Sequence, residues 1–108
     1  KGKISKIFEK NNTIFCYCIS DYPIKFEKIN WKQAVKYDGF SDHTMNIIAP
    51  ILFTILKKQK RSKIIYIEKH VKIENSEGPD ASTSISTIQL SEMIKNIRLI
   101  EKMNNYNE

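Results

Sequence analysis

Gly39-Phe40-Ser41-Asp42-His43-Thr44 is the stretch of sequence that decides the fold. It places a glycine, two hydroxyls, a carboxylate and an imidazole close together, and an apolar run at 47–56 follows directly. Polar side chains crowded between a short strand and a helix are typical of active-site loops in α/β proteins, where chemistry gathers at the carboxyl ends of parallel strands. We therefore expect a very short strand at 39–41, a functional loop and then a helix.

Two other apolar runs end in the same way. Ser-Asp-Tyr-Pro at 20–23 follows the run at 14–19, and Glu-Lys-His at 68–70 closes the run at 64–67. The separation of these clusters along the chain is that of one strand–helix unit each. Because the carboxyl ends of parallel strands meet at one edge of a sheet, we expect the three polar clusters to lie together.

The order of the remaining segments predicts a parallel sheet covered by helices. β-branched and aromatic residues predict strands at 13–19 and 63–73. The apolar residues of the lysine-rich segment 1–10 recur at helical spacing and predict the last turns of a helix. A loop is expected at 74–83 and a frayed end at 104–108. A helix followed by three strand–helix units is the pattern of a parallel α/β fold.

Three helices are expected between and after the strands. Asn30 should cap a short helix at 31–36, and Ser86 has the spacing to Gln89 of a capping box for a last helix that ends near Met103. Proline is tolerated in the first turn, so the helical stretch 45–60 should properly begin near Ala49. The apolar stripe expected on that helix consists of Ile48, Leu52, Ile55 and Leu56.

Composition bounds the class of protein. The chain has 108 residues, of which 41% are hydrophobic, and suits a single domain. None of its apolar runs reaches the roughly 20 residues of a membrane span, and its start lacks the apolar core and cleavage site of a secretory signal, so we expect a cytoplasmic protein. Cys16 and Cys18 are too few for a disulfide framework and are expected to be buried, reduced thiols.

The net charge of +6 invites a nucleic-acid hypothesis. The densest basic cluster, at 57–63, falls at the end of a predicted helix, where cations suit the negative end of the helix dipole. We interpret it as a solvated helix end. Acidic residues are interspersed among the basic ones and no nucleic-acid-binding motif is present, so we do not expect nucleic acid as a partner. A small basic nucleic-acid-binding module is the alternative function.

Three strand–helix units do not complete a fold by themselves. A closed (β/α)8 barrel takes about 250 residues, and a three-stranded parallel sheet has two open edges. The expected fold class is therefore α/β, a partial TIM barrel of about three parallel β-α units, completed by missing chain or by association. We expect a homo-oligomer with apolar residues such as Phe15 and Ile65 at the contact, and a non-catalytic self-associating fragment is a further alternative.

Together, the polar clusters resemble motifs of the sialic acid synthase family, which makes N-acetylneuraminic, pseudaminic and legionaminic acids. The motifs occur in the same order and at the same spacing from residue 15 to residue 103, and four motifs in register are more specific than any one alone. The matching residues are Cys18, Ser20, Tyr22 and Pro23, the stretch 39–44, Ala49 and Pro50, the stretches 67–70 and 77–80, and Ser84.

The resemblance implies a barrel enzyme that condenses phosphoenolpyruvate with an open-chain N-acetylated hexose, such as N-acetylmannosamine, and releases phosphate. Such an enzyme is a metal-dependent transferase that forms a carbon–carbon bond, with Mn²⁺ or Mg²⁺ as its divalent metal. Residues 1–108 would be the C-terminal part of the catalytic barrel, without the antifreeze-like domain that follows it in the family. Because the first half of the barrel is then missing, we expect the isolated chain to be inactive.

The resemblance also implies roles for single residues. His43 matches the family's metal histidine, and imidazole suits manganese-class metals beside oxygen donors. Ser41 matches a position near phosphoenolpyruvate, and Asp42 is expected either to orient His43 or to contact sugar hydroxyls. The residues expected to bind substrate are Ser20, Ser41, Asp42, Lys69 and Tyr17, and no catalytic acid or base is assigned.

Two positions depart from the family pattern. Tyr17 stands where many members have a second metal histidine, and a neutral phenol is a poor ligand for manganese. Ala81 stands where many relatives have another histidine. At the third strand end, Glu68 and Lys69 are equally consistent with an ion network and with a substrate role, and His70 is interpreted as a structural histidine. The identity of the sugar is left open.

Overall fold

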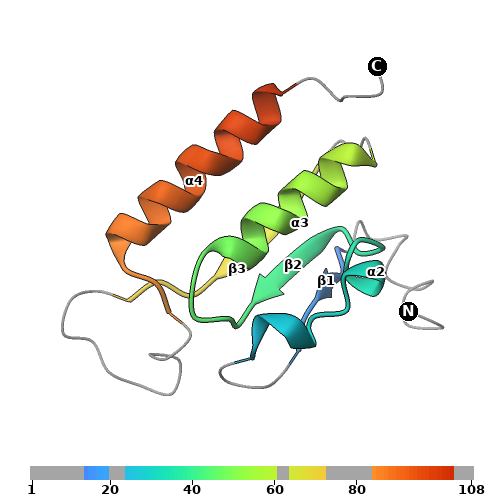
Figure 1. Cartoon of the computed structure of the whole chain (residues 1–108), viewed down its shortest axis with the longest axis horizontal. Coiled ribbons are helices and arrows are strands. Elements are labelled where there is room, and N and C mark those ends of the chain that lie inside the picture. The colour runs from blue at the N-terminus through green and yellow to red at the C-terminus, as the bar shows by residue number, and fades with distance from the viewer. Residues whose placement is uncertain (1–13, 20–23, 61–63, 73–83, 104–108) are drawn as a thin grey trace.

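The computed structural model describes residues 14–19, 24–60, 64–72 and 84–103. The elements in chain order are β1 (Cys16–Tyr17), the 3-10 helix η1 (Phe26–Lys28), α2 (Trp31–Ala34), β2 (Gly39–Asp42), α3 (Ile48–Gln59), β3 (Tyr66–Lys69) and α4 (Thr87–Lys102). Strands and helices alternate along the chain as the sequence predicts, with η1 as an unpredicted addition (Figure 1). The predicted helix at 1–10, the loop at 74–83 and the end at 104–108 lie outside the described residues.

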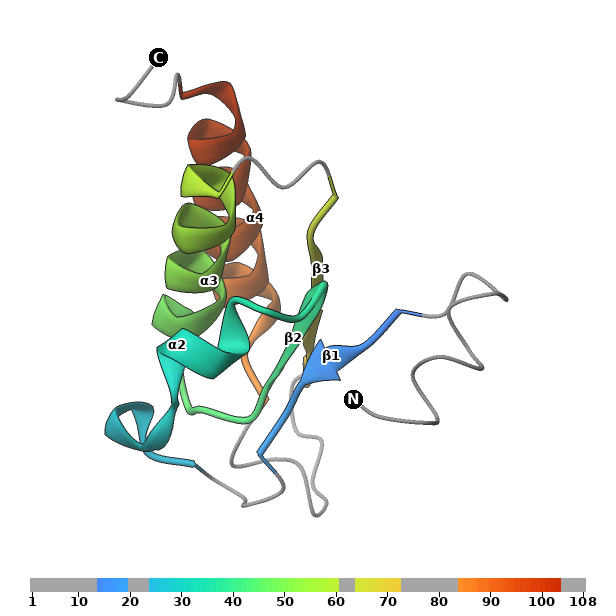
Figure 2. The same cartoon turned by 90° about the vertical axis from the view of Figure 1, so that its right-hand side faces the viewer.

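The three strands form one parallel sheet in the order β1-β2-β3. Gly39 of β2 is in register with Cys16 of β1 on one side and with Tyr66 of β3 on the other. β3 has four residues, fewer than the predicted run at 63–73, because its partner β2 also has four. All the described helices lie on one side of the sheet (Figure 2). The fold is therefore α/β with parallel strands, as predicted.

The core lies between β2 and the helices. Its buried cluster consists of Ile29, Ala34, Phe40, Ala49 and Phe53. The ring of Phe40 stacks on Phe53 of α3, with centroids 5.2 Å apart, and on Trp31 of α2 at 5.5 Å. Each fully buried large apolar side chain contributes roughly 1.5–3 kcal/mol, so these rings carry much of the stability of the sheet–helix contact.

Both predicted helix caps are present. Asn30 Oδ1 accepts a hydrogen bond from the Gln33 N–H at 3.1 Å, at the start of α2. Ser86 Oγ accepts from the Gln89 N–H, and Gln89 Oε1 accepts from the Ser86 N–H, which completes the capping box of α4. These bonds satisfy N–H groups of the first turn that have no partner within the helix.

The buried face of α3 differs from the predicted stripe. Ile48 is 56% exposed, whereas Ala49 and Phe53 are fully buried. The run at 47–56 is apolar on almost every side, so its pattern alone does not select the face that meets the sheet. The stacking of Phe53 on Phe40 selects it instead. α3 begins at Ile48, next to the predicted Ala49, and Pro50 lies in its first turn as expected.

The interpretation of the basic cluster as a solvated helix end is wrong for Lys57. Its side chain is buried, and Nζ donates a hydrogen bond to the Val35 carbonyl oxygen at 3.1 Å. Burial lowers the pKa of Lys57; Asp38 opposes this effect and Lys60 adds to it. The aliphatic stem of a lysine packs readily on apolar surface, which lets α3 bury this residue beside Phe53.

The sheet has a second face, opposite the described helices, which we call the helix-free face. Side chains alternate along a strand, so the residues that point there are Cys16, Cys18, Gly39, Ser41, Tyr66 and Glu68. The prediction that both cysteines are buried is therefore wrong, and both are exposed free thiols.

The choice of Phe15 and Ile65 as residues exposed for an oligomer contact is also wrong. Ile65 packs against the buried core on the helix side, and the alternation places Phe15 on that side together with Tyr17. Ile64, 63% exposed, and Tyr66, 40% exposed, are the apolar side chains that point to the helix-free face instead.

Candidate functional site

The carboxyl ends of the three strands are neighbours. Asp42, the last residue of β2, is in register with Lys69, the last residue of β3. His43 follows β2, and its Nδ1 lies 3.0 Å from the carbonyl oxygen of Ile19, just beyond β1. The polar clusters of β2 and β3 therefore meet at one edge of the sheet, as the sequence predicts. Ser20 lies outside the described residues.

Ser41 and Glu68 form a pair on the helix-free face. They are in register on β2 and β3, and Ser41 Oγ donates a hydrogen bond to Glu68 Oε1 at 2.5 Å. Cys16 points to the same face, where burial raises the pKa of its thiol and Glu68, Asp38 and Cys18 raise it further. A thiol kept protonated is a weak nucleophile, so the face offers a hydroxyl and a carboxylate as its reactive groups.

Asp42 and Lys69 point to the opposite side, toward the helices. Lys69 Nζ lies 2.9 Å from Asp42 Oδ2, and the two side chains are 1% and 0% exposed. The Asp42 carboxylate also accepts hydrogen bonds from the N–H and the hydroxyl of Thr44. Within one motif, strand alternation thus separates Ser41 from Asp42, and the predicted ion network joins Lys69 to Asp42 rather than to Glu68.

His43 is buried beneath the sheet edge, with 5% of its surface exposed. Besides the Ile19 carbonyl, its Nδ1 lies 3.6 Å from Cys18 Sγ. The ring stacks on that of His70, with centroids 6.0 Å apart. The contact of Nδ1 with the Ile19 carbonyl oxygen holds the ring in one orientation.

Tyr17 lies on the helix side of β1. Its ring stacks on Phe40 at 6.0 Å, and its hydroxyl accepts a hydrogen bond from the Asn30 N–H at 3.2 Å. The phenol therefore ties β1 to the start of α2. Whether it also contacts a substrate stays a prediction.

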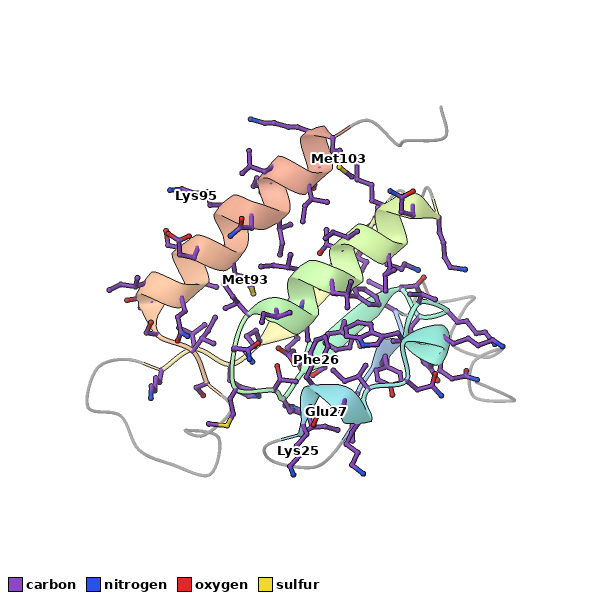
Figure 3. The ribbon with its side chains drawn as sticks, viewed as in Figure 1. Lys25, Phe26, Glu27, Met93, Lys95 and Met103 are labelled. Atoms are coloured by element: carbon purple, nitrogen blue, oxygen red, sulfur yellow. The ribbon has the colours of Figure 1, made fainter. Side chains whose placement is uncertain are left out.

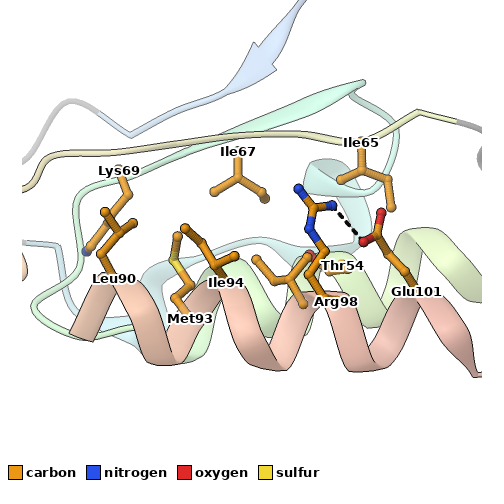
Figure 4. A pocket seen from close by; sticks show the side chains of 10 residues that line it. Thr54, Ile65, Ile67, Lys69, Leu90, Met93, Ile94, Arg98 and Glu101 are labelled. Atoms are coloured by element: carbon orange, nitrogen blue, oxygen red, sulfur yellow. Dashed lines mark hydrogen bonds and ion pairs between the residues drawn. The ribbon is translucent and has the colours of Figure 1, made fainter. Parts of the chain in front are cut away.

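Two hollows of the described chain have predicted site residues in their walls, and neither opens the strand ends to a substrate-sized space beside His43. The one beside His43 holds only about 10 Å³, barely enough for one water molecule. A larger one, about 330 Å³, lies between β3 and α4, and its walls include Ile65, Ile67 and Met93 (Figure 4). Met93 points from α4 toward α3, whereas Lys95 points away (Figure 3). This larger cavity is a gap in the packing between β3 and α4 on the helix side of the sheet, and it reaches Lys69 at the end of β3.

Comparison with known proteins identifies the chain's relatives. Residues 3–108 match the NeuB family. The chain belongs to the NeuB family. It is 37% identical over 110 residues to an uncharacterised protein of Methanocaldococcus jannaschii, covering 91% of this chain and 31% of that protein. It is 32% identical over 110 residues to pseudaminic acid synthase of Campylobacter jejuni, covering 92% of this chain and 30% of that enzyme.

A solved structure shares the fold of this NeuB-family chain. It is the crystal structure of N-acetylneuraminic acid synthetase from Leptospira borgpetersenii in complex with citrate, with a TM-score of 0.71 and 27% sequence identity. The alignment covers 91% of this chain and 36% of that one. The chain thus corresponds to part of a sialic acid synthase barrel, and it spans about a third of the length of the relatives that it matches.

Among the described residues of this NeuB-family chain, His43 alone is a candidate metal ligand. Within the described residues, no group of three or more His, Cys, Asp or Glu side chains could hold a metal ion. His43 Nδ1 contacts a backbone carbonyl oxygen, whereas the Asp42 carboxylate is bound by Thr44 and Lys69. A metal held here would need its other ligands from outside the described residues or from water.

Sequence reasoning reached most of these residues but did not weigh Glu68 correctly. Glu68 was expected, together with Lys69, either in an ion network or in contact with substrate, and its pairing with Ser41 on the neighbouring strand was not predicted. The register of the sheet supplies the missing information: Gly39 pairs with Tyr66, so Ser41 and Glu68, each two positions further on, share a face. No described helix is long and apolar enough to cross a membrane.

Proposed function

We propose that this chain forms the last three β-α units of a nonulosonate synthase barrel. That enzyme condenses phosphoenolpyruvate with an N-acetylated hexose, such as N-acetylmannosamine, and releases phosphate. The observation that carries the proposal is the meeting of His43 with the ends of all three strands in a chain of the NeuB family. Parallel α/β folds place their chemistry at this edge.

His43 is the residue proposed to bind the metal. Its Nδ1 lies 3.0 Å from a backbone carbonyl oxygen, and such a contact orients the ring of a metal-binding histidine. When bound, a divalent ion such as Mn²⁺ or Mg²⁺ polarises the sugar aldehyde as a Lewis acid. Tyr17, in place of a second histidine, packs against Phe40, so the remaining ligands are proposed to be water or groups from elsewhere in the barrel.

Ser41 and Ser20 are proposed to contact substrate directly. Ser41 is half-buried on the helix-free face, which corresponds to the interior of a barrel whose helices lie outside. The Glu68 carboxylate beside it would repel a phosphate and accept a hydroxyl proton, so a sugar hydroxyl suits this pair better than a phosphate oxygen. Direct substrate contacts by Tyr17, Asp42 and Lys69 are less well supported, because all three point toward the helices.

The remainder of the barrel must be supplied from elsewhere. We propose that residues 1–108 act as the C-terminal part of the catalytic barrel, joined by further chain or by a second copy, and that they are inactive alone. The proposed location is the cytoplasm, a reducing compartment that suits two exposed free thiols. No specific observation favours nucleic-acid binding, since Lys57 of the basic cluster is buried.

The metal role can be tested by calorimetry. We expect a protein that carries these residues within a complete barrel to bind Mn²⁺, and His43→Ala to weaken binding by about tenfold or more, since losing even an outer partner of a metal ligand costs about 10–100-fold. His70→Ala is the matched control, because His70 stacks on His43 but is interpreted as structural. Equal Mn²⁺ affinity in the wild type and His43→Ala would remove the assigned role.

A further inference from the structure

The residue whose role the proposed mechanism leaves unexplained is Lys69. Its ammonium group is buried on the helix side and reaches two oxygen atoms at once, Asp42 Oδ2 at 2.9 Å and the Thr44 carbonyl at 2.5 Å. Asp42 and Thr44 are the residues immediately before and after His43. Lys69 therefore holds both ends of the three-residue turn that carries the imidazole.

The turn is also closed on itself. Asp42 Oδ1 accepts hydrogen bonds from the Thr44 N–H at 2.9 Å and from the Thr44 hydroxyl at 2.8 Å. Such a side-chain-to-backbone bond two residues on is the geometry of an Asx-turn, which fixes the backbone of the residue between. The Lys69 ammonium completes it, because it binds the other carboxylate oxygen and the carbonyl at the far end.

Burial prevents this ammonium from serving as a surface charge. A buried ion pair contributes little net stability compared with apolar side chains of the same volume, because desolvation offsets the attraction. What it provides is one defined geometry, since each charge must keep its partner. A methionine would fill the same space but could not bridge the Asp42 and Thr44 oxygen atoms.

We infer that Lys69 is a positioning residue that sets the direction of the His43 imidazole. The inference builds on the proposed role of His43, and it revises the expectation that Lys69 itself binds substrate. Lys69 reaches the imidazole only through Asp42 and Thr44, so its removal should move His43 without removing any metal donor.

The test is Lys69→Met in the 108-residue chain, followed by NMR of the His43 ring and of the Thr44 amide. We expect the His43 ring signals to shift and the Thr44 amide to exchange with solvent at least tenfold faster than in the wild type. Lys57→Met is the matched control, since Lys57 is also a buried lysine that donates to a carbonyl oxygen, that of Val35, away from the turn. It should leave both signals unchanged even if it lowers stability as much.

A second variant keeps the inference testable if Lys69→Met does not fold. Asp42→Asn/Lys69→Met leaves no unpaired buried charge, and its His43 and Thr44 signals should also differ from those of the wild type. Signals identical to those of the wild type in a folded Lys69 variant would overturn the positioning role.

Mn²⁺ binding separates this inference from the proposed function. In a complete barrel, Lys69→Met should lower Mn²⁺ affinity at least threefold, and Lys57→Met should not change it. If Mn²⁺ does not bind even to the wild type, the proposed metal role fails, while the NMR comparison still decides whether Lys69 positions the ring.

Discussion

At the scale of single residues, strand parity assigns the roles. Ser41 and Asp42 are adjacent in the sequence, yet one pairs with Glu68 on the helix-free face and the other with Lys69 on the helix side. The same alternation sends Cys16 outward and Tyr17 into the core. One motif therefore provides both Ser41, which is proposed to contact substrate, and Asp42, which holds the loop in place.

Gly39 is required for the close approach of the three strands. An added Cβ would lie 2.6 Å from Cys16 Sγ and 3.0 Å from the Tyr66 carbonyl oxygen. Gly39→Ala should lower the free energy of unfolding by about 1–3 kcal/mol, the usual cost of overpacking, as measured by urea denaturation. Adding Cys16→Ala should recover only part of the loss, because the Tyr66 backbone remains. An unchanged midpoint and slope for Gly39→Ala would contradict this packing.

Lys57 should make stability depend on pH in the alkaline range. Burial lowers the pKa of Lys57 in the folded chain, so between that pKa and the ordinary value of 10.5 the unfolded chain binds more protons. Folding stability then rises with pH across this window as the cost of the buried charge disappears. Lys57→Met lacks this contribution, and the urea midpoint of the wild type should rise relative to that of the variant. Parallel curves for the two proteins would show that the ammonium group is hydrated in the folded chain.

Sequence alone predicted the residues of the strand ends, and it could not assign their sides. Runs such as 14–19 and 64–67 are apolar without strict alternation, so they contain no periodic signal that marks the face toward the helices. The hydrogen bond of Lys57 to Val35, and those of Lys69 to Asp42 and Thr44, join residues more than 20 positions apart in the sequence. Local caps, by contrast, involve residues three positions apart, and both were predicted correctly.

At the scale of elements, α3 shows how tertiary packing overrides an ambiguous pattern. Its sequence offers apolar residues on several sides, and the face with Ala49 and Phe53 is buried because it matches the ring of Phe40. The register of the sheet, in turn, depends on Phe40 lying on the helix side of β2.

Substitutions on the two sides of α3 should therefore have very different effects. Phe53→Ala should lower the free energy of unfolding by about 3–5 kcal/mol, because it leaves a cavity beneath Phe40. Ile48→Ala, on the exposed side of the same helix, should change it by less than about 1 kcal/mol. Thermal or urea unfolding of both variants measures these changes. A larger loss of unfolding free energy for Ile48→Ala than for Phe53→Ala would show that the stripe containing Ile48 is the buried face.

At the scale of the whole molecule, the described helices cover one face of the sheet only (Figure 2). The chain spans about a third of the length of the relatives that it matches. The helix-free face carries the exposed side chains of Ile64 and Tyr66 beside the polar pair of Ser41 and Glu68. An apolar surface of this kind is normally covered in a barrel by the strands opposite.

The isolated chain should therefore associate through this face. Light scattering should give a mass that is a multiple of 12.7 kDa, and Tyr66→Lys should shift it toward the monomer. Ile88→Lys is the control, because Ile88 is 76% exposed but lies on α4. A wild-type chain that stays monomeric, or equal dissociation by both variants, would argue against completion of the sheet through the helix-free face.

The most direct test of the central claim is phosphate release from phosphoenolpyruvate by a protein that carries these residues within a complete barrel. With Mn²⁺ present, we predict release that requires an N-acetylated hexose and that falls by about tenfold or more in His43→Ala. Release at the full rate by His43→Ala, or no release with any N-acetylated hexose, would contradict the proposal that this sheet edge is part of a nonulosonate synthase site.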